Sequence, residues 1–488
     1  MNLSHFYSDK PAFQTLEDIK NKNVLVMGLG LNGGGEATVR FLLKHGANVT
    51  ITDMKTKEQL ASTISSLEND KELDCSKIKY VLGCHNIEDF ENADVVIKNP
   101  GVKYTGNKYL AVAKQIETDL SIFLHFTKAP IIAVTGSKGK SSTVSAIHYG
   151  LTQAGFQTFL GGNITVSPLT FLDKTSEKTP VVLELSSWQL SDLRGRKLLK
   201  PYIRLITKIV PDHQNWYGNM ESYVADKKLI YADQDSSCFS IFTADDSWGE
   251  TFASESKAQV LRYSSFSNTN IEENSKNAYG FLDKNDKGWI QNKLVLSETL
   301  VPGHHMKENL LNAGIVMSLM KVPEEEICKI LSTYKGIHHR LEYFHEWTNS
   351  KNQKIKFYND SAATVPEAAV AAISSFEKNV FALCGGTDKE LDFLPLAENA
   401  HKATKLFLLA GTGTDKLLPM LKEKNIHFFG PYGSLQDMLE EVKTELNNFE
   451  QDSVVVFSPG ATSFGMFNNE FDRGEKYKKQ LLKIFKNE

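Results

Sequence analysis

Short apolar runs alternate with segments of helical periodicity along most of the chain. The run Val24–Met27 predicts a strand, the pattern over Glu36–His45 predicts a helix, and Asn48–Thr52 predicts a second strand. Further strands are expected at Tyr80–Leu82 and Asp94–Lys98. Strands that alternate with helices in this way are typical of a parallel sheet with helical connections.

The middle of the chain continues this alternation and then changes character. From about Tyr263 to Leu300 the sequence becomes polar and rich in Asn, which predicts loops and a small antiparallel sheet. Before that segment, apolar runs predict strands at Pro130–Val134, Pro180–Leu185 and Tyr202–Val210. Helical patterns cover Ser222–Ala232 and Met306–Met320.

The last third of the chain predicts a second doubly wound parallel sheet. Its strand candidates, with helical patterns between them, are Lys354–Tyr358, Val380–Leu383, Lys405–Leu409, His427–Phe429 and Ser453–Phe457. A chain of 488 residues is too long for a single core. We therefore expect an α/β protein of three domains: a Rossmann-like domain over 1–129, a central P-loop ATPase-type domain with a small antiparallel sheet over 130–336, and a Rossmann-like C-terminal domain over 337–488.

Composition narrows the class of protein. The formal net charge is −4, which argues against a nucleic-acid-binding protein. No apolar run approaches the ~18 residues that a membrane span needs, and the first ten residues lack the apolar core of a signal peptide. The five cysteines form no C-x-x-C pair, which suits a reducing compartment. These features predict a cytoplasmic protein without membrane insertion.

The segment Ile131–Thr143 carries the clearest chemical signal. An apolar strand leads into a turn bracketed by Gly136 and Gly139, and Lys140-Ser141-Ser142 then opens a helix. Backbone N–H groups in such a turn point at a phosphate, and the helix N-terminus adds partial positive charge. The lysine would reach the outer phosphates of a nucleotide, and the Ser141 hydroxyl would bind magnesium. We predict a nucleoside triphosphate site here.

A second glycine-rich turn lies near the N-terminus. The sequence Gly28-Leu-Gly30-Leu31-Asn32-Gly33 follows a strand, and Asp53 stands twenty residues beyond it. Taken alone this is the fingerprint of NAD binding, in which the acid holds a ribose hydroxyl. The glycines permit close approach of a phosphate, but they do not identify the nucleotide.

Other polar residues follow predicted strands, where open parallel sheets bind ligands. Glu184 would supply a hard oxygen ligand for Mg²⁺, and His213, beside Asp212, is expected to bind or orient near that metal. Lys227 lies between Asp226 and Lys228, a pattern that by itself is typical of a solvated helix face. In the last third, two cations are candidates, Arg340 for a phosphate and Lys389 for a carboxylate.

The order of these motifs resembles the Mur ligases, the ATP-dependent amide-forming enzymes of peptidoglycan synthesis. Within that family the resemblance is greatest to members that add D-glutamate to UDP-N-acetylmuramoyl-L-alanine. The match covers nearly the whole chain. Its motifs are Gly28–Gly33, Ala93–Gly101, Thr135–Ser141, Glu184–Gln189, Asp212-His213, Tyr223-x-x-x-Lys227, Gly303-x-His305-x-x-x-Asn309, Gly336-x-x-His339-Arg340-x-Glu342, Asn359–Ser361, Gly385-Gly386-x-x-Lys389 and Ser458-Pro-x-x-x-Ser463.

The resemblance implies a role for each motif. The first domain would bind the UDP precursor rather than NAD, with Asn163 close to the reacting phosphate. Two Mg²⁺ ions are implied, one on Ser141 and Glu184 and a second on His213 and Lys227, whose side chain would be carbamylated. The ATP-binding residues would be Gly136, Ser137, Lys138, Gly139, Lys140, Ser141, Ser142, Asn309, Arg340 and Asp360; the precursor-binding residues Gly30, Leu31, Asn32, Asp53 and Asn163; the amino-acid-binding residues Lys389, Ser463 and Phe464; and the catalytic residues Lys140, Glu184, His213 and Lys227.

The implied reaction transfers the γ-phosphoryl group of ATP to a carboxylate. The resulting acyl phosphate is attacked by the amine of the incoming amino acid, and ADP and phosphate are released. We expect a monomer that acts on small molecules, and closure of the third domain to exclude water. Four positions depart from the family pattern: Lys138 in the phosphate turn, Met306 at an adenine contact, and Ala362 and Glu470 near the amino-acid site.

Three rival interpretations remain open. The first is another ligase of this superfamily, such as one that adds alanine, a diamino acid or a dipeptide, or that extends folate with glutamate. The second is an NAD-dependent oxidoreductase, which would leave Gly136–Ser142 unexplained. The third is a non-catalytic nucleotide-binding regulator, against which the joint presence of Lys140, Glu184, His213 and Lys227 argues.

Overall fold

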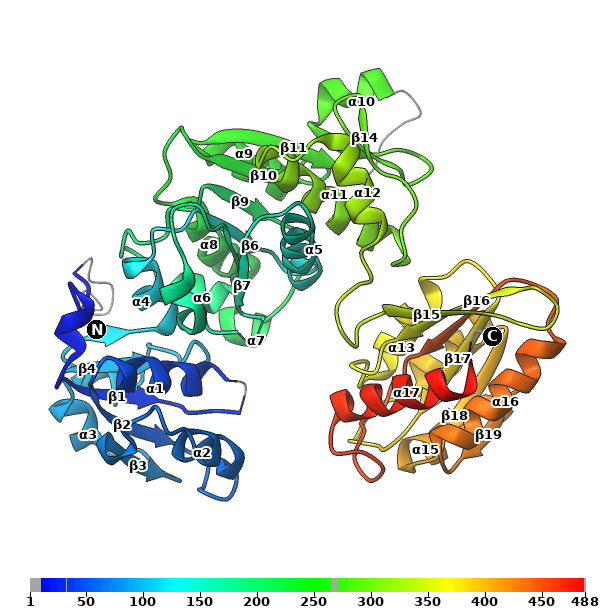
Figure 1. The fold of residues 1–488 in the computed structure, drawn as a ribbon, viewed down its shortest axis with the longest axis horizontal. Helices are drawn as coiled ribbons and strands as arrows, with labels where there is room; N and C mark the ends of the chain where they lie inside the picture. Colours follow the sequence, from blue (N-terminus) through cyan, green and yellow to red (C-terminus); the bar gives the residue numbers. More distant parts are fainter. Residues whose placement is uncertain (1–9, 32, 165, 266–270, 487–488) are drawn as a thin grey trace. The chain divides into compact units, whose positions relative to one another are not determined.

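The structure is a computed structural model that describes residues 10–31, 33–164, 166–265 and 271–486 (Figure 1). The chain forms two compact units. The first unit comprises residues 1–285, 289–293 and 311–327, and the second comprises residues 286–288, 294–310 and 328–488. The described residues form three sheets, and the first unit holds two of them apart from residues 288 and 294–296 at one edge of the central sheet. Among the described residues, no helix has the length and apolar character needed to cross a bilayer.

The N-terminal sheet is parallel throughout, with the strand order β3-β2-β1-β4-β5. Its strands are β1 (Asn23–Met27), β2 (Asn48–Asp53), β3 (Ile78–Leu82), β4 (Val95–Lys98) and β5 (Ile116–Glu117). The connecting helices are η1 (Leu16–Ile19), α1 (Gly34–Lys44), α2 (Ala61–Glu68), η2 (Cys75–Lys77), α3 (Ile87–Asn92), η3 (Leu110–Val112) and α4 (Asp119–Phe126). The predicted strand–helix–strand unit is confirmed as β1, α1 and β2.

The central sheet has nine strands in the order β14-β13-β12-β11-β10-β9-β6-β8-β7. They are β6 (Ile131–Thr135), β7 (Phe159–Gly162), β8 (Val181–Glu184), β9 (Ile203–Ile206), β10 (Phe239–Thr243), β11 (Gln259–Ser264), β12 (Gly280–Leu282), β13 (Gly288–Ile290) and β14 (Lys293–Leu296). Its helices are α5 (Lys140–Gln153), η4 (Pro168–Lys174), α6 (Ser187–Asp192), α7 (Gln214–Tyr217), α8 (Met220–Lys228), η5 (Leu229–Tyr231), α9 (Ser247–Glu255), α10 (Ile271–Asn277), α11 (His304–Leu319) and α12 (Glu324–Ser332).

The C-terminal sheet, in the second unit, has six strands in the order β15-β16-β20-β17-β18-β19. They are β15 (Glu342–Thr348), β16 (Lys354–Asn359), β17 (Val380–Gly385), β18 (Lys405–Leu409), β19 (Phe429–Tyr432) and β20 (Ser453–Phe457). Only the edge strand β15 runs antiparallel to its neighbour. The helices are α13 (Pro366–Ser374), α14 (Leu394–Asn399), η6 (Ala400–Lys402), α15 (Thr412–Glu423), α16 (Leu435–Asn448) and α17 (Glu470–Ile484).

The cores explain these layers. In the second unit, α16 and α17 cover one face of the sheet and α13, α14 and α15 cover the other, each over its own apolar cluster. In the first unit a single cluster runs from the N-terminal sheet through α4 and η4 into the central sheet. This shared core makes one compact unit of two sheets. The α/β class with three sheets is confirmed, whereas the domain boundaries at 129 and 336 stay predictions.

Several elements differ from the prediction in their extent. The segment from 263 to 300 supplies β12, β13 and β14, which extend the edge of the central sheet beyond β11 rather than forming a sheet of their own. Strand β9 ends at Ile206, before the predicted Val210, and β19 begins only at Phe429. Strands β5, β7, β10, β11 and β15 were not predicted. The sequence of β15, Glu-Tyr-Phe-His-Glu-Trp-Thr, is half-buried at an edge and lacks an apolar run.

Candidate active site

The phosphate-type turn joins β6 to α5 as predicted. Gly136 has φ of 147° and Gly139 has φ of 90°, both in the region that favours glycine. A Cβ atom on Gly136 would lie 1.9 Å from Oγ1 of Thr207, so no side chain fits there. Thr207 in turn donates to the backbone carbonyl of Lys138 (2.7 Å), and thus fixes the turn from the end of β9. No motif in the sequence indicates this role of Thr207.

Two lysines converge on the first glycine of this turn. Nζ of Lys140, at the start of α5, lies 3.0 Å from the carbonyl oxygen of Gly136 and 3.1 Å from that of Ser137. Nζ of Lys227, on α8, donates to the same Gly136 oxygen at 2.8 Å. The two amines therefore lie at one point of the turn, although 87 positions separate them in the sequence.

The prediction of a solvated helix face for Lys227 is wrong. The residue is 1% exposed, because α8 packs against α6 and the turn, and its Nζ lies 4.5 Å from the ring centre of Tyr223. Burial, followed by repulsion from Lys140, lowers the pKa of Lys227 to about 7. Burial also lowers the pKa of Lys140, against the attraction of Glu184 and Asp212. At neutral pH the Lys227 side chain thus has a substantial neutral fraction.

Glu184, at the end of β8, is the buried carboxylate of this site. It is 2% exposed, and its Oε1 accepts a hydrogen bond from Nδ2 of Asn163 at 2.8 Å. Its Oε2 is buried without a hydrogen-bond partner. An unpaired carboxylate oxygen is costly to bury, whereas it is a suitable ligand for Mg²⁺. The donor set at this point fits the predicted cation.

The remaining predicted residues of the turn lie around this centre. Ser141 and Ser142 stand half-buried in the first turn of α5. Ser137 is held by the backbone carbonyl of Val210, to which its hydroxyl donates at 2.9 Å, and by the Tyr223 hydroxyl at 3.1 Å. The spacing Tyr223-x-x-x-Lys227 places both side chains on one face of α8.

His213 and Lys138 are the exposed members of the set. His213 begins α7 with a positive φ of 51°, and its ring lies 5.0 Å from that of Trp188. The Lys138 side chain is 70% exposed, and its Nζ lies 3.7 Å from the Asp212 carboxylate. Such an exposed pair contributes little to stability.

The N-terminal glycine turn lines a cavity of about 540 Å³ within the first unit. Asp53 does not line it, because its carboxylate accepts the backbone N–H groups of Gly30 (3.0 Å) and Lys55 (2.9 Å). The structure thus joins turn residues to Asn163 and to Trp188 and Gln189, two residues of the Glu184–Gln189 motif for which no individual role was predicted. Asn32 lies outside the described residues. The lining includes Gly28, Gly30, Leu31, Asn99, Gly101, Asp119, Asn163, Trp188 and Gln189.

A larger cavity, of about 1060 Å³, lies elsewhere in the first unit. It is bordered by the C-terminal half of α1, by Phe126 and Lys128, and by η4 together with residues 175–178. None of the residues predicted for the site lines this cavity. The size of a cavity therefore does not identify the site here, whereas the chemistry of its lining does.

In the second unit, Arg340 and Asp360 lie close together. Oδ1 of Asp360 accepts the backbone N–H of Leu341 at 3.0 Å, and its Oδ2 accepts the Ser458 hydroxyl at 2.6 Å. Burial raises the pKa of Asp360 to about 6, against the stabilising charge of Arg340. The Arg340 side chain is exposed, and Asn309 is buried on α11.

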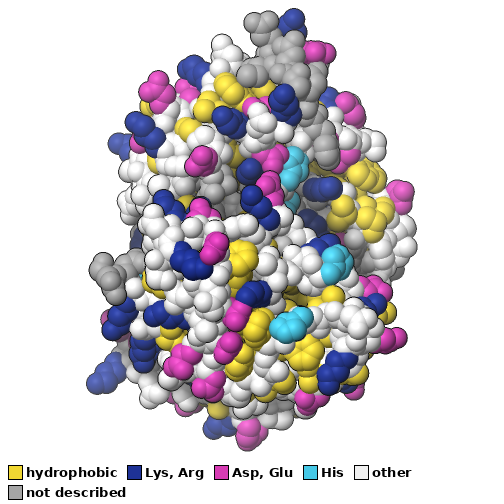
Figure 2. All heavy atoms as spheres, turned by 90° about the vertical axis from the view of Figure 1, so that its right-hand side faces the viewer, with side chains coloured by type: hydrophobic (Ala, Val, Ile, Leu, Met, Phe, Trp, Pro, Cys, Tyr) yellow, Lys and Arg dark blue, Asp and Glu magenta, His cyan; other side chains and the backbone are white. Residues whose placement is uncertain are grey.

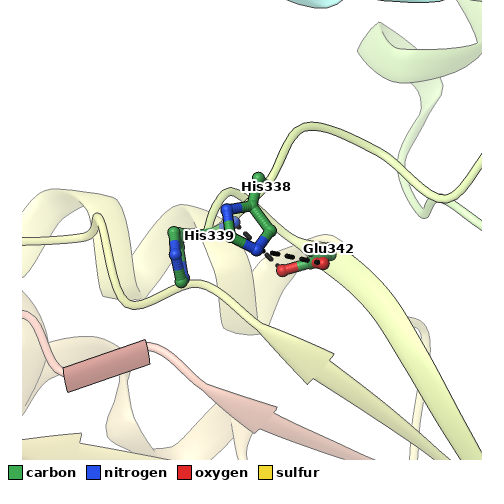
Figure 3. Close-up of side chains that lie close together, drawn as sticks. All are labelled: His338, His339 and Glu342. Carbon is green, nitrogen blue, oxygen red and sulfur yellow. Dashed lines mark hydrogen bonds and ion pairs between the residues drawn. The ribbon is translucent and has the colours of Figure 1, made fainter. Parts of the chain in front are cut away.

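His338, His339 and Glu342 form a cluster beside Arg340 (Figure 3). Their possible ligand atoms lie within 4.8 Å of one another, but Nζ of Lys478 stands 3.0 Å from both Nε2 of His338 and Oε1 of Glu342. The Asn359 amide donates to Nδ1 of His339 at 2.8 Å, which places the histidine proton on Nε2. An ammonium and an N–H group therefore take the place that a metal would need, and the cluster holds the Arg340 turn against α17.

The residues predicted for the amino acid lie on two adjoining loops of the second unit. Thr387 and Thr462 exchange backbone hydrogen bonds of 3.1 and 3.0 Å, which brings the loop of Lys389 beside the loop of Ser463. The Lys389 and Phe464 side chains are exposed, and Ser463 is buried. Met306 is buried, and Glu470 opens α17, where its backbone oxygen accepts the Ser361 hydroxyl at 2.7 Å.

On the face drawn in Figure 2, basic and acidic side chains are interspersed.

Comparison with protein families matches two regions of the chain. Residues 22–121 match the family described as Mur ligase MurD-like, N-terminal domain, and residues 134–317 match the Mur ligase middle domain. The proteins named UDP-N-acetylmuramoylalanine–D-glutamate ligase from Treponema pallidum and Borreliella afzelii are 38% and 40% identical to this chain. These alignments cover 96% and 95% of this chain, and 98% of each relative.

Solved structures show the same fold at low sequence identity. UDP-N-acetylmuramate-alanine ligase MurC from Thermotoga maritima has a TM-score of 0.57 and 16% identity, over 95% of this chain and all of that one. The MurF ligase from the same organism, in complex with ADP, has a TM-score of 0.52 and 15% identity, over 96% of each chain. Similarity at this level concerns the fold alone.

Proposed function

The chain belongs to the Mur ligase family, and from this premise we propose how its residues divide the work of an ATP-dependent ligation. The enzyme joins D-glutamate to UDP-N-acetylmuramoyl-L-alanine in peptidoglycan synthesis, with ATP as the energy source. The observation that carries the assignment of residues is the convergence of Lys140 and Lys227 on the Gly136 carbonyl, in a site where Glu184 attracts both amines.

In the first step, the γ-phosphoryl group of ATP would pass to the carboxylate of the precursor's alanine. Lys140 would leave its present backbone acceptors and bind the outer phosphates, while the N–H groups of the turn Gly136–Ser142 hold the β-phosphate. The bond to the carboxylate oxygen forms as the bond to ADP breaks, and negative charge spreads over the transferred oxygens. Lys140 is the positive charge in this chain best placed to stabilise that charge.

Glu184 and Ser141 would hold one Mg²⁺, and His213 and Lys227 a second. When bound, magnesium supplies Lewis-acid stabilisation of the phosphoryl oxygens. Lys227 suits its proposed role only after reaction with CO₂, because an ammonium repels a cation whereas a carbamate offers it oxygen ligands. The lowered pKa of Lys227, about 7, supports this proposal, since only the neutral amine attacks CO₂.

The second step joins the amine of D-glutamate to the activated alanine. Lys389 and Ser463 would bind its carboxylates, with the exposed Phe464 against its side chain, and the tetrahedral intermediate would collapse to the amide with release of phosphate. Asn309, Arg340 and Asp360 would bind the adenine, a phosphate and the ribose of the nucleotide. Gly30, Leu31 and Asn32 would face the UDP of the precursor, and Asn163 its reacting end. Asp53, predicted to face the UDP as well, would instead support the turn through the N–H of Gly30, because it does not line the cavity.

An amino-acid-dependence assay tests this assignment. Purified protein is mixed with ATP, Mg²⁺ and UDP-N-acetylmuramoyl-L-alanine, single amino acids are added, and phosphate release is followed. We expect release with D-glutamate and none with L-glutamate, L-alanine or meso-diaminopimelate. Ala362 and Glu470 depart from the family pattern near the amino-acid site. The identity of the amino acid is therefore the part of the proposal that this assay tests most directly. Release with another amino acid alone would assign the chain to a different member of the family.

We further propose that the enzyme works as a monomer in the cytoplasm, where ATP and the nucleotide precursor are made. Small-molecule substrates suit a Mur ligase, and the mixture of charges on the face in Figure 2 offers no continuous basic field. Light scattering behind size-exclusion chromatography, with and without ATP and precursor, measures the oligomeric state. A stable dimer mass would contradict this part of the proposal.

A further inference from the structure

A buried ion pair ties the two sheets of the first unit together beside the 540 Å³ cavity. Lys98 ends β4 in the N-terminal sheet, and Asp192 ends α6 beside the central sheet. Nζ of Lys98 lies 2.9 Å from Oδ2 of Asp192, and the side chains are 1% and 4% exposed. Burial raises the pKa of Asp192 to about 7 and lowers that of Lys98, so each charge depends on the other.

The Lys98 ammonium also organises the turn that follows its own strand. It donates to the backbone oxygens of Asn99 (2.9 Å) and Val102 (2.8 Å), and it forms the ion pair with Asp192 at the same time. Asn99 and Gly101 of this turn line the cavity, and the Asn99 side chain lies against Gly28 of the glycine turn. Lys98 is itself one of the lining residues, and its Nζ lies beside Asp192.

Asp192 connects this turn to the opposite wall. Helix α6 begins with Trp188 and Gln189, which line the cavity, and ends with Asp192, which faces Lys98. The helix has only six residues, and the Ser186–Gln189 capping box holds its first turn together. We therefore expect the helix to move as one piece, so that a shift at Asp192 also moves Trp188 and Gln189. The pair thus connects the turn on one wall with the helix on the other.

We propose that Lys98 and Asp192 are positioning residues that set the width of the precursor cavity, and so control binding of a ligand that spans both walls. This inference rests on the proposed function, because it assumes that the cavity binds a nucleotide-linked substrate. The buried pair between Arg196 and Glu117, at 2.6 Å, lies nearby and makes a second connection between the same two parts. Neither Arg196 nor Glu117 lines the cavity, whereas Lys98 does, and Asp192 lies on the same short helix as the lining residues Trp188 and Gln189.

The structure offers a matched control pair. Lys44 at the end of α1 and Asp173 in η4 also join the N-terminal part to the central part, at 2.8 Å, but their side chains are 63% and 57% exposed. This pair borders the larger cavity instead. Exposed pairs of this kind contribute little, and the variant Lys44→Met removes a connection of the same type without touching the precursor cavity.

The test measures binding by calorimetry of two ligands, UDP alone and UDP-N-acetylmuramoyl-L-alanine, to the full chain. Asp192→Asn keeps the donation of Lys98 to the turn but removes the charge that holds α6. We expect its affinity for the full precursor to fall about tenfold, while its affinity for UDP changes less than about twofold. Lys98→Met, which also releases the turn, is expected to weaken both ligands. Lys44→Met is expected to weaken neither, and the KM for ATP is expected to stay the same in all three.

Each outcome of these measurements supports or contradicts the proposed role of the Lys98–Asp192 pair. If Asp192→Asn binds the full precursor as tightly as the unchanged protein, or weakens both ligands equally, the pair does not set the cavity width. A general loss of structure would lower ATP binding as well and would appear as a lower melting temperature. If Lys98→Met does not fold, Asp192→Asn alone gives the answer. If the unchanged protein does not bind the precursor, the proposed function fails together with this inference.

Discussion

The two glycine-rich turns of the first unit have the same local design and opposite electrostatic surroundings. Each follows a buried strand, β1 or β6, and opens a helix, α1 or α5. Each helix begins behind a glycine in the left-handed conformation, Gly33 with φ of 83° and Gly139 with φ of 90°. Backbone geometry alone therefore does not distinguish the two turns.

The difference comes from residues that are distant in sequence. At the first turn, the carboxylate of Asp53 accepts the N–H of Gly30, and so places an acid behind the turn. At the second, the amines of Lys140 and Lys227 lie on the Gly136 carbonyl, where Glu184 attracts them both. The spacing of the glycines allows a turn that can hold a phosphate group. The charged side chains around the turn then determine whether it only binds its ligand or also supports phosphoryl transfer.

The largest expected effect is that of Lys140→Ala. This variant removes the cation that would stabilise the transferred phosphoryl group, so we expect ADP formation to fall by at least about 10³-fold. The measurement is a coupled ADP assay with saturating precursor. Binding of the precursor by calorimetry is the control and should not change, because the first turn is untouched. Turnover at the normal rate would refute the assignment of the phosphate site.

Alanine at one glycine of each turn sharpens the contrast in packing. Gly136→Ala would place a Cβ 1.9 Å from Thr207 Oγ1, so we expect loss of ATP binding and destabilisation by several kcal/mol. Gly30→Ala meets no atom within 4 Å, and only its φ of 63° costs about 1–2 kcal/mol. Chemical denaturation compares their free energies of unfolding. Equal losses in the two variants would mean that the turns are equally packed.

Lys227→Ala tests whether a carbamate supplies oxygen ligands. We expect about 10²-fold lower activity, with partial recovery on addition of acetate, because a small carboxylate can occupy the space vacated by the modified side chain. Lys227→Arg is the control, since it keeps a positive charge and fills that space, and it should not recover. Full activity in Lys227→Arg would show that only a cation is needed there.

Asp53→Asn tests the acid behind the first turn. The amide keeps the shape of the side chain but offers one acceptor in place of two, so one of the N–H groups of Gly30 and Lys55 loses its partner. We expect the KM for the precursor to rise a few-fold, on the order of 1 kcal/mol, and the KM for ATP to stay constant. A change in the KM for ATP alone would contradict the assignment of the first turn to the precursor.

Lys138→Ala is expected to have the smallest effect. Its side chain is 70% exposed and its pair with Asp212 is 3.7 Å long, so we expect less than about 1 kcal/mol in stability and no more than about twofold in the KM for ATP. The same assays measure both. A tenfold rise in that KM would place Lys138 on the bound nucleotide and enlarge the cationic set of the second turn.

The strands that the sequence located best are the ones buried in parallel sheets. Lys405–Leu409 and Ser453–Phe457 were predicted to the residue as β18 and β20, since a buried parallel strand is a continuous apolar run. Edge strands were located less well. The half-buried β15 has no apolar run, and β19 lies two residues beyond its predicted start. A half-buried edge strand needs apolar residues on one face only, so its sequence is less distinctive than the continuous apolar run of a strand buried on both faces.

The sequence alone determined the elements whose signal is local: the apolar strands, the glycines that permit left-handed turns, and Lys140 at the start of a helix. Only the tertiary structure decided that Lys227, between two charged neighbours, is buried against Gly136. It also decided that Lys98 of the N-terminal sheet forms an ion pair with Asp192, which lies beside the central sheet. The physical reason is that local geometry depends on adjacent residues, whereas burial and charge pairing depend on groups that folding brings from distant parts of the chain.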